Sequence, residues 1–260
     1  MKLGSPAANP RRGILIIALA CASVLAFIVL FIIDRSPKTG PQPSPGQLGD
    51  GSWVVTSSGI FEERLAEFTG SRLRLRVATR PLRGEPVKFP NNEMSRFLGA
   101  RTREKVSLKP GARLSVDLDW NKQANGSQLT AGLVLSPVAI TDGNPFGLPQ
   151  CAWIEFIGVP PGKNARRVIG VREDDHHRHL DAEGWPDTNR EGRPIAVQRI
   201  EIRVEKDGQF RVFENGEEAY VSPLGTLKFD TAYLYLQVSS RPNYPPREVF
   251  FDNIVFTPGT

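Results

Sequence analysis

Hydrophobic and polar residues alternate in short runs along most of the chain after residue 48. Runs of Val, Ile, Leu, Phe and Tyr are broken by Gly, Pro, Asn and Asp, and none keeps a helical repeat over about eleven residues. Candidate strands are Leu73–Val77, Ala112–Trp120, Leu129–Leu135, Ala152–Val159, Arg167–Val171, Ala232–Ser239 and Glu248–Phe256. The pattern predicts an all-β sandwich or barrel of antiparallel strands.

Residues 199–221 carry the clearest strand pattern and fit a three-stranded meander. A three-residue loop at Lys206–Gly208 and a two-residue type I′ turn at Asn215–Gly216 suit the sequence. These turns predict the cross-strand pairs Val204–Phe210, Ile202–Val212, Val212–Ala219 and Phe210–Val221. All these side chains, with Ile200, then lie on one face, and a slip of one residue would scatter them to both faces.

The longest apolar run precedes the β domain. Residues 13–33 carry no charge and, at about 1.5 Å per helical residue, can cross a hydrocarbon core of about 30 Å. A cleaved signal peptide would end on small residues, whereas this run stays bulky to Ile33. We therefore expect a single-pass transmembrane signal anchor.

The flanks of this run indicate its orientation. Lys2, Arg11 and Arg12 precede it, which favours a cytoplasmic amino terminus. The expected organisation is then a cytoplasmic tail (1–12), the transmembrane anchor (13–33), a Pro-rich linker (34–47) and an extracytoplasmic β-sandwich domain (48–260).

Charge and cysteine content narrow the function. The net charge is +5, but three of the 33 basic residues precede the anchor, so the remainder nearly balances the 28 acidic residues. Such a balance argues against a nucleic-acid partner. The two cysteines, Cys21 in the apolar run and Cys151 in the β domain, predict no intrachain disulfide.

Three stretches resemble concanavalin A-like lectin/glucanase domains, which include the laminin G-like jelly rolls. Phe210–Gly216 resembles their strand ending in Val-Tyr-x-Asn-Gly, Gly70–Arg76 resembles their early strand, and Val249–Phe256 resembles their closing Phe-x-Asp-Asn-Ile strand. The resemblance covers residues 48–258 and implies a two-sheet antiparallel jelly-roll sandwich. Members of this fold bind glycans, cleave them or act as spacers, so the fold does not select among these functions.

Catalysis would require two carboxylates about 5–10 Å apart. The laminarinase-like branch of the resembled superfamily supplies them from one strand as Glu-x-Asp-x-x-Glu. Here Glu155 is followed at the matching position by Ile157, so the partner acid is missing. A glycan hydrolase or lyase would need Glu155 to act with a carboxylate from elsewhere, such as Asp174 or Asp175.

Two segments contain potential metal ligands. His177 and His179 would lie on one side of an extended chain and suit a transition metal, although this stretch also indicates a solvated polar loop. Asp142 and Asn144 suit a structural Ca²⁺, although their sequence is also typical of a turn.

The best candidate glycan platform lies on one strand. Tyr233, Tyr235 and Gln237 alternate with apolar residues, which places them on the non-core face, where tyrosine rings can stack on sugars. Packing between strands explains exposed tyrosines equally well. Trp185 and Tyr244 are further candidate contacts.

These observations predict a membrane-anchored extracytoplasmic module that binds carbohydrate or another cell-envelope component without catalysis. A glycan-cleaving hydrolase or lyase of the same fold, and a structural or protein-interaction module, are the alternatives. The expected partners are a membrane, through residues 13–33, and a glycan or envelope component. No cofactor is required beyond the structural Ca²⁺ considered above.

Overall fold

A computed structural model describes residues 48–59, 63–78, 96–120, 129–157, 166–174, 176–182, 197–240 and 247–259. The predicted tail, anchor and linker (1–47) lie outside these residues. Among the residues that are described, no helix is long and apolar enough to cross a membrane.

The described chain consists almost entirely of strands. They are β1 (Trp53–Ser58), β2 (Glu63–Thr69), β3 (Arg72–Ala78), β4 (Arg96–Thr102), β5 (Val106–Ser107), β6 (Arg113–Asp119), β7 (Leu129–Ser136), β8 (Gln150–Ile157), β9 (Arg166–Glu173), β10 (His176–Ala182), β11 (Gln198–Val204), β12 (Phe210–Glu214), β13 (Glu217–Val221), β14 (Thr231–Ser240) and β15 (Arg247–Thr257). Three 3₁₀ turns accompany them: η1 (Asp50–Ser52), η2 (Pro145–Gly147) and η3 (Lys206–Gly208).

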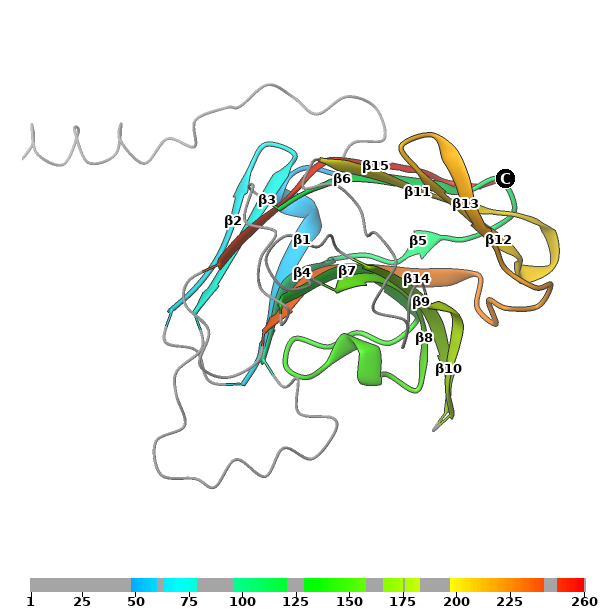
Figure 1. Cartoon of the computed structure of the whole chain (residues 1–260), viewed down its shortest axis with the longest axis horizontal. Helices are drawn as coiled ribbons and strands as arrows, with labels where there is room; N and C mark the ends of the chain where they lie inside the picture. The colour runs from blue at the N-terminus through cyan, green and yellow to red at the C-terminus, as the bar shows by residue number, and fades with distance from the viewer. Residues whose placement is uncertain are drawn as a thin grey trace, which may run out of the picture. The chain divides into compact units, whose positions relative to one another are not determined.

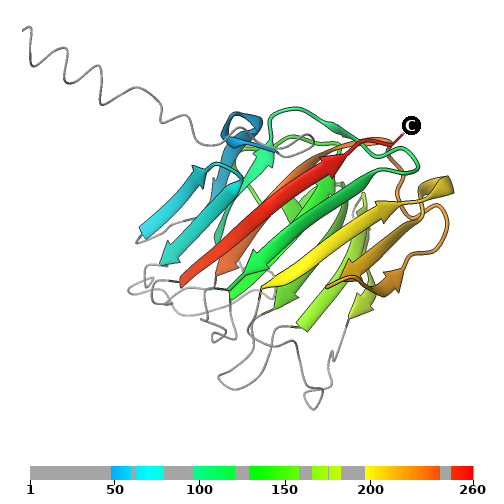
Figure 2. The ribbon, with the colours of Figure 1, turned by 90° about the horizontal axis from the view of Figure 1, so that it is seen from above.

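The strands form two antiparallel sheets stacked as a sandwich, so the all-β prediction is confirmed (Figure 1). In the described part of the chain, the eight-stranded sheet has the order β1-β4-β14-β7-β8-β9-β10, with β5 beside β14. The seven-stranded sheet has the order β13-β12-β11-β6-β15-β3-β2, and Figure 2 shows it from above.

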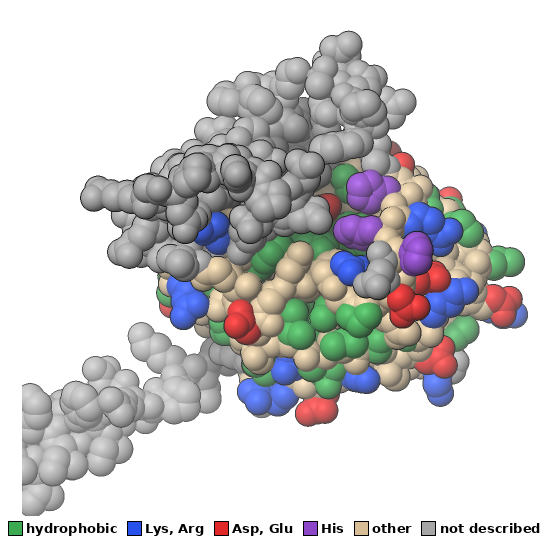
Figure 3. Space-filling model, turned by 90° about the horizontal axis from the view of Figure 1, so that it is seen from below, with side chains coloured by type: hydrophobic (Ala, Val, Ile, Leu, Met, Phe, Trp, Pro, Cys, Tyr) green, Lys and Arg blue, Asp and Glu red, His purple; other side chains and the backbone are tan. Residues whose placement is uncertain are grey.

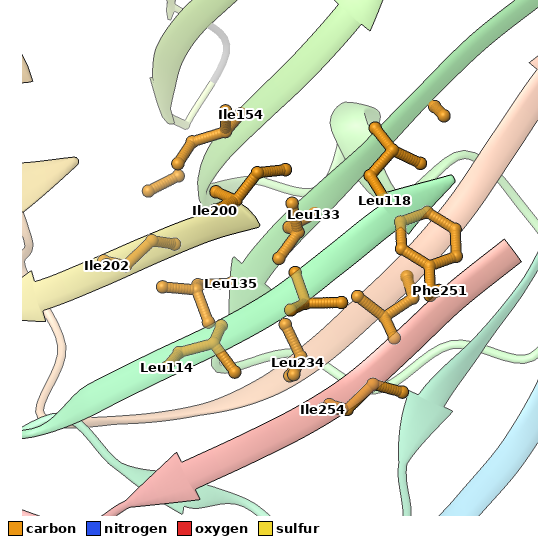
Figure 4. Packing of buried hydrophobic residues seen from close by; sticks show 14 of the residues in the cluster. Leu114, Leu118, Leu133, Leu135, Ile154, Ile200, Ile202, Leu234, Phe251 and Ile254 are labelled. Atoms are coloured by element: carbon orange, nitrogen blue, oxygen red, sulfur yellow. The ribbon is translucent and has the colours of Figure 1, made fainter. Parts of the chain in front are cut away.

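The core lies between the sheets because apolar residues alternate with polar ones along each strand. In β3, Leu73, Leu75 and Val77 are buried, while the arginines between them lie on the outer face. Figure 4 shows side chains from both sheets meeting there, among them Leu133 and Phe251.

The outer face of the seven-stranded sheet carries cross-strand ion pairs. Arg74 pairs with Glu248 (2.5 Å) and Arg199 with Asp117 (3.2 Å), while Arg72 lies over the Phe250 ring. Basic and acidic side chains thus alternate over this face, which fits the expectation that the charge is balanced.

The predicted meander is confirmed in its first hairpin and corrected in its second. Val204 pairs with Phe210, as expected. Asn215 and Gly216 form the turn with φ values of 53° and 89°, but a register shift follows, and Val212 faces Tyr220 instead of Ala219. Tyr220 therefore packs against the core and Val221 is exposed.

The polar stretch around the histidines is also corrected. The sequence favours a loop there, whereas the structure forms β10, the last strand of the eight-stranded sheet. An edge strand needs a partner on one side only and tolerates charged side chains. Hydrophobic alternation is therefore a weak signal for such a strand.

Candidate functional site on the concave face

The outer face of the eight-stranded sheet is concave, because the sheet arches between its margins at β1 and β10 (Figure 1). Across its middle, backbone pairing aligns Gly99, Gln237, Gly132 and Glu155 on four adjacent strands. Gln237 and Glu155 both point away from the core. We call these four positions the Gly132 slot.

Gly132 places no side chain of its own between Gln237 and Glu155. Adjacent strands lie about 4.8 Å apart, so the backbones of Gln237 and Glu155, on either side of β7, are roughly 10 Å apart. A Cβ at Gly132 would lie 2.5 Å from the carbonyl oxygen of Ile154 and 2.9 Å from the Cα of Glu155. Only glycine fits this close approach. The slot is therefore flanked by an amide and a carboxyl group.

The Gln237 side chain is buried without a partner. It is 1% exposed, and neither its Nε2 nor its Oε1 makes a hydrogen bond. An unsatisfied buried amide costs roughly 1–3 kcal/mol, and such groups in native structures call for a specific explanation. A ligand that supplies both an acceptor and a donor would remove this cost.

Glu155 is partly buried, and burial raises the pKa of its carboxyl group to about 7. The indole N–H of Trp153 opposes this rise slightly, although its nitrogen makes no hydrogen bond of normal geometry. No charged side chain contributes to the shift. Glu155 is therefore largely a neutral acid below pH 7 and can donate a hydrogen bond.

Trp153 extends the slot toward β10. Its ring lies across Gly170, where a Cβ would collide with the indole. The ring centroids of Trp153 and His177 are 4.5 Å apart, and those of Trp153 and His179 are 6.2 Å apart. Burial, together with nearby His179 and Arg172, lowers the pKa of His177. Figure 3 shows the histidines side by side on this face, next to hydrophobic side chains.

The connection between β7 and β8 covers the predicted glycan platform. Tyr235 is fully buried; its hydroxyl donates to the carbonyl oxygen of Val138 (2.6 Å) and accepts from the amide of Ile140 (3.0 Å). Phe146 and Leu148 of this connection pack in the same cluster. The structure thus corrects the expectation that Tyr235 offers its ring to a ligand, because alternation does not reveal what covers a face.

Tyr233 lies nearer the start of β14 and is partly buried. The Arg101 guanidinium and the Lys105 ammonium lie 4.9 Å and 5.6 Å from its ring centroid. Cations thus already contact this ring. The other two predicted glycan contacts, Trp185 and Tyr244, lie outside the described residues.

The predicted metal ligands do not form one centre. Asn144 accepts a hydrogen bond from the Phe146 amide (2.9 Å) and caps η2, which supports the interpretation of this segment as a turn. Asp142 is exposed in the same connection, whereas His177 and His179 lie on β10. Within the described ranges, no group of three or more His, Cys, Asp or Glu side chains could hold a metal ion.

The concave face offers little for two-carboxylate catalysis. At the outward positions of its described strands, Glu155 is the only carboxylate. Asp174 lies in the β9–β10 turn with φ of 51°, and Asp175 is outside the described residues. Burial raises the pKa of the Cys151 thiol to about 12, so this cysteine is not a nucleophile at neutral pH.

Sequence reasoning identified Gln237 and Glu155 separately but missed their juxtaposition, and it did not select Gly132 or Trp153. A glycine inside an apolar strand is a signal for close backbone approach. What joined these residues was the β14–β7–β8 register, and pairing between strands far apart in sequence is not encoded in local patterns.

No protein-family model matches the chain, and no curated protein matches it. Solved structures do resemble it. A prokaryotic β-1,3-1,4-glucanase (lichenase) derived from a mouse hindgut metagenome shares 11% identity over 82% of this chain and 96% of that chain, with a TM-score of 0.54.

Two further structures give similar values. One described as a native glycosidic hydrolase shares 9% identity over 83% of this chain and 94% of its own, with a TM-score of 0.52. One from a study of endo-acting O-glycanases of human gut microbiota shares 9% over 86% and 97%, with a TM-score of 0.51. At these identities the likeness shows the fold alone, and it agrees with the concanavalin A-like sandwich inferred from the sequence.

Proposed function

We propose that this protein is a membrane-anchored extracytoplasmic module that binds carbohydrate on its concave face without cleaving it. The anchor is residues 13–33, and the ligand site is the Gly132 slot. The observation that carries the proposal is the buried, unpartnered amide of Gln237 beside a neutral carboxyl group. Amides and carboxyl groups are the side chains that bind sugar hydroxyls.

The carboxylate content of the same face supports binding without catalysis. Hydrolysis with retention or inversion needs two carboxylates, and Glu155 is the only one at the outward positions of the described strands. Across Gly132 from Glu155, Gln237 supplies an amide and not a second acid.

Binding and turnover can be tested on the full-length protein purified in detergent. We expect soluble glycans to bind with dissociation constants below the millimolar range in calorimetry, and Gln237→Leu to weaken binding at least tenfold. Because the substitution removes an unsatisfied amide, the melting temperature should hold or rise. Gln150→Leu, at an exposed position on β8, is the matched control and should change neither quantity.

Two results would overturn the proposal. One is the absence of binding to any glycan at millimolar concentration. The other is unchanged binding by Gln237→Leu. The release of new reducing or unsaturated ends would instead support the second candidate, a hydrolase or lyase. That candidate is favoured by one observation, because a carboxyl pKa of about 7 suits a general acid.

A further inference from the structure

The Gly132 slot is rich in hydrogen-bond donors that have no acceptor. The Nε2 group of Gln237 and the indole N–H of Trp153 are both buried without a hydrogen-bond partner. Glu155 lies two residues after Trp153 on β8 and across Gly132 from Gln237, and as a neutral acid it adds an O–H donor. Three such donors on one face of the sheet fit an anionic oxygen group better than a hydroxyl, which is itself a donor.

The charged side chains around the Gly132 slot also favour an anionic ligand. Arg172, His177 and His179 occupy outward positions of β9 and β10, and Arg101 lies on β4 at the other side. Opposing them, Glu155 is the sole carboxylate at the outward positions of the described strands of the eight-stranded sheet. On the outer face of the seven-stranded sheet, Arg74 and Arg199 pair with carboxylates.

We propose that the Gly132 slot binds the carboxylate of an acidic sugar residue, such as a uronic acid, within the glycan recognised by the concave face. This inference rests on the proposed function and specifies its ligand class. Gln237 Nε2 and Trp153 Nε1 donate to the sugar carboxylate, and Gln237 Oε1 accepts from a neighbouring sugar hydroxyl. Glu155 shares its proton with the bound carboxylate.

Binding should depend on pH through Glu155. Its neighbours across the sheet are Gly132 on β7, Val168 on β9 and, beyond Gly132, Gln237 on β14, none of which titrates. The nearest titratable or charged side chains at outward positions are His179 and His177 on β10 and Arg172 on β9. Burial and the neighbouring His179 and Arg172 lower the pKa of His177. A loss of affinity between pH 6.5 and 8.5 that disappears in Glu155→Gln would therefore report Glu155.

The decisive ligands are a pair that differ only in the carboxylate. An oligouronate and the same oligosaccharide after reduction of its carboxyl groups to alcohols can be titrated into the full-length protein in detergent. At pH 6.5 we expect the oligouronate to bind at least tenfold more tightly. Between pH 6.5 and 8.5 its affinity should fall by roughly tenfold or more, since ionised Glu155 repels the ligand.

Variants test whether the ionisation of Glu155 causes the pH dependence of oligouronate binding. Glu155→Gln keeps a donor at every pH, so it should bind the oligouronate at pH 8.5 as the wild type does at pH 6.5, with a flat pH profile. Gln237→Glu should abolish oligouronate binding through repulsion. Glu218→Gln, on exposed β13, is the control and should leave the pH profile unchanged.

The outcomes are distinguishable. Equal binding of the oligouronate and its reduced form would overturn the acidic-sugar inference and leave carbohydrate binding intact. Binding of sulfated saccharides without oligouronates would overturn the carboxylate assignment. Binding of none of these would count against both proposals. A pH profile that persists in Glu155→Gln would exclude Glu155 as its origin.

Discussion

At the scale of single residues, Glu155 couples stability to pH. Its pKa is about 7 in the folded protein against an ordinary value of 4.5, so the folded state holds the proton more tightly between these values. Stability is therefore fully present below pH 4.5 and declines as the pH rises to about 7. The shift corresponds to at most about 3 kcal/mol at higher pH.

We predict that Glu155→Gln stabilises the protein more at pH 8 than at pH 5, by about 2 kcal/mol, because glutamine does not ionise. Urea unfolding of both proteins at the two pH values measures this difference. Exposed Glu218→Gln should show less than about 0.5 kcal/mol. An equal effect of Glu155→Gln at both pH values would mean that the Glu155 carboxyl titrates normally.

The sheet face on which each strand residue lies was predictable from the sequence, whereas the burial of the outward-facing residues was not. Tyr233, Tyr235 and Gln237 do lie on the side away from the main core. Their exposure depended on the β7–β8 connection, whose polar turn residues gave no sign that Phe146 and Leu148 would pack onto the sheet. The alternation of apolar and polar residues predicts on which face of a sheet a side chain lies. It does not predict whether a further segment of the chain packs onto that face.

At the scale of elements, Tyr235 holds the β7–β8 connection against β14. Its hydroxyl bonds both Val138 and Ile140. We predict that Tyr235→Phe lowers the free energy of unfolding by about 1–2 kcal/mol, because both backbone groups lose their partner. Amide hydrogen exchange should show faster exchange at Ile140.

Tyr233→Phe is the matched control on the same strand. Its ring contacts are with Arg101 and Lys105 and do not involve the hydroxyl, so the free energy of unfolding should change by less than about 0.5 kcal/mol. Unchanged exchange at Ile140 in Tyr235→Phe would show that the connection is held by apolar packing alone.

Among the described strands inside the sheets only β4 was missed, whereas of the edge strands β13 was predicted and β1, β2 and β10 were not. The seven single strands expected from alternation are all present, with ends within two residues. β10 was missed because it is an edge strand that pairs with β9 alone, so it tolerates polar residues that show no hydrophobic alternation. The register shift between Val212 and Phe213 was missed because a bulge inserts a residue without changing the turn sequence.

At the scale of the whole molecule, Arg167 joins the two sheets. It extends from β9 in the eight-stranded sheet and donates to Glu214 on β12 in the seven-stranded sheet. It also pairs with Asp181 (2.6 Å) and donates to the carbonyl oxygen of Ala219 (3.3 Å). The guanidinium is only 5% exposed, so these interactions are poorly screened by solvent.

We predict that Arg167→Met destabilises the protein by about 3 kcal/mol, because breaking a buried pair removes the cation that the Glu214 carboxylate contacts. The double variant Arg167→Met/Glu214→Gln should recover part of this loss, since it also removes the negative charge of Glu214. Exposed Arg211→Met, which breaks the pairs with Glu205 and Glu218, should cost less than about 1 kcal/mol. Urea unfolding measures all three variants. If Arg167→Met resembled Arg211→Met, apolar packing alone would hold the sheets together at this margin.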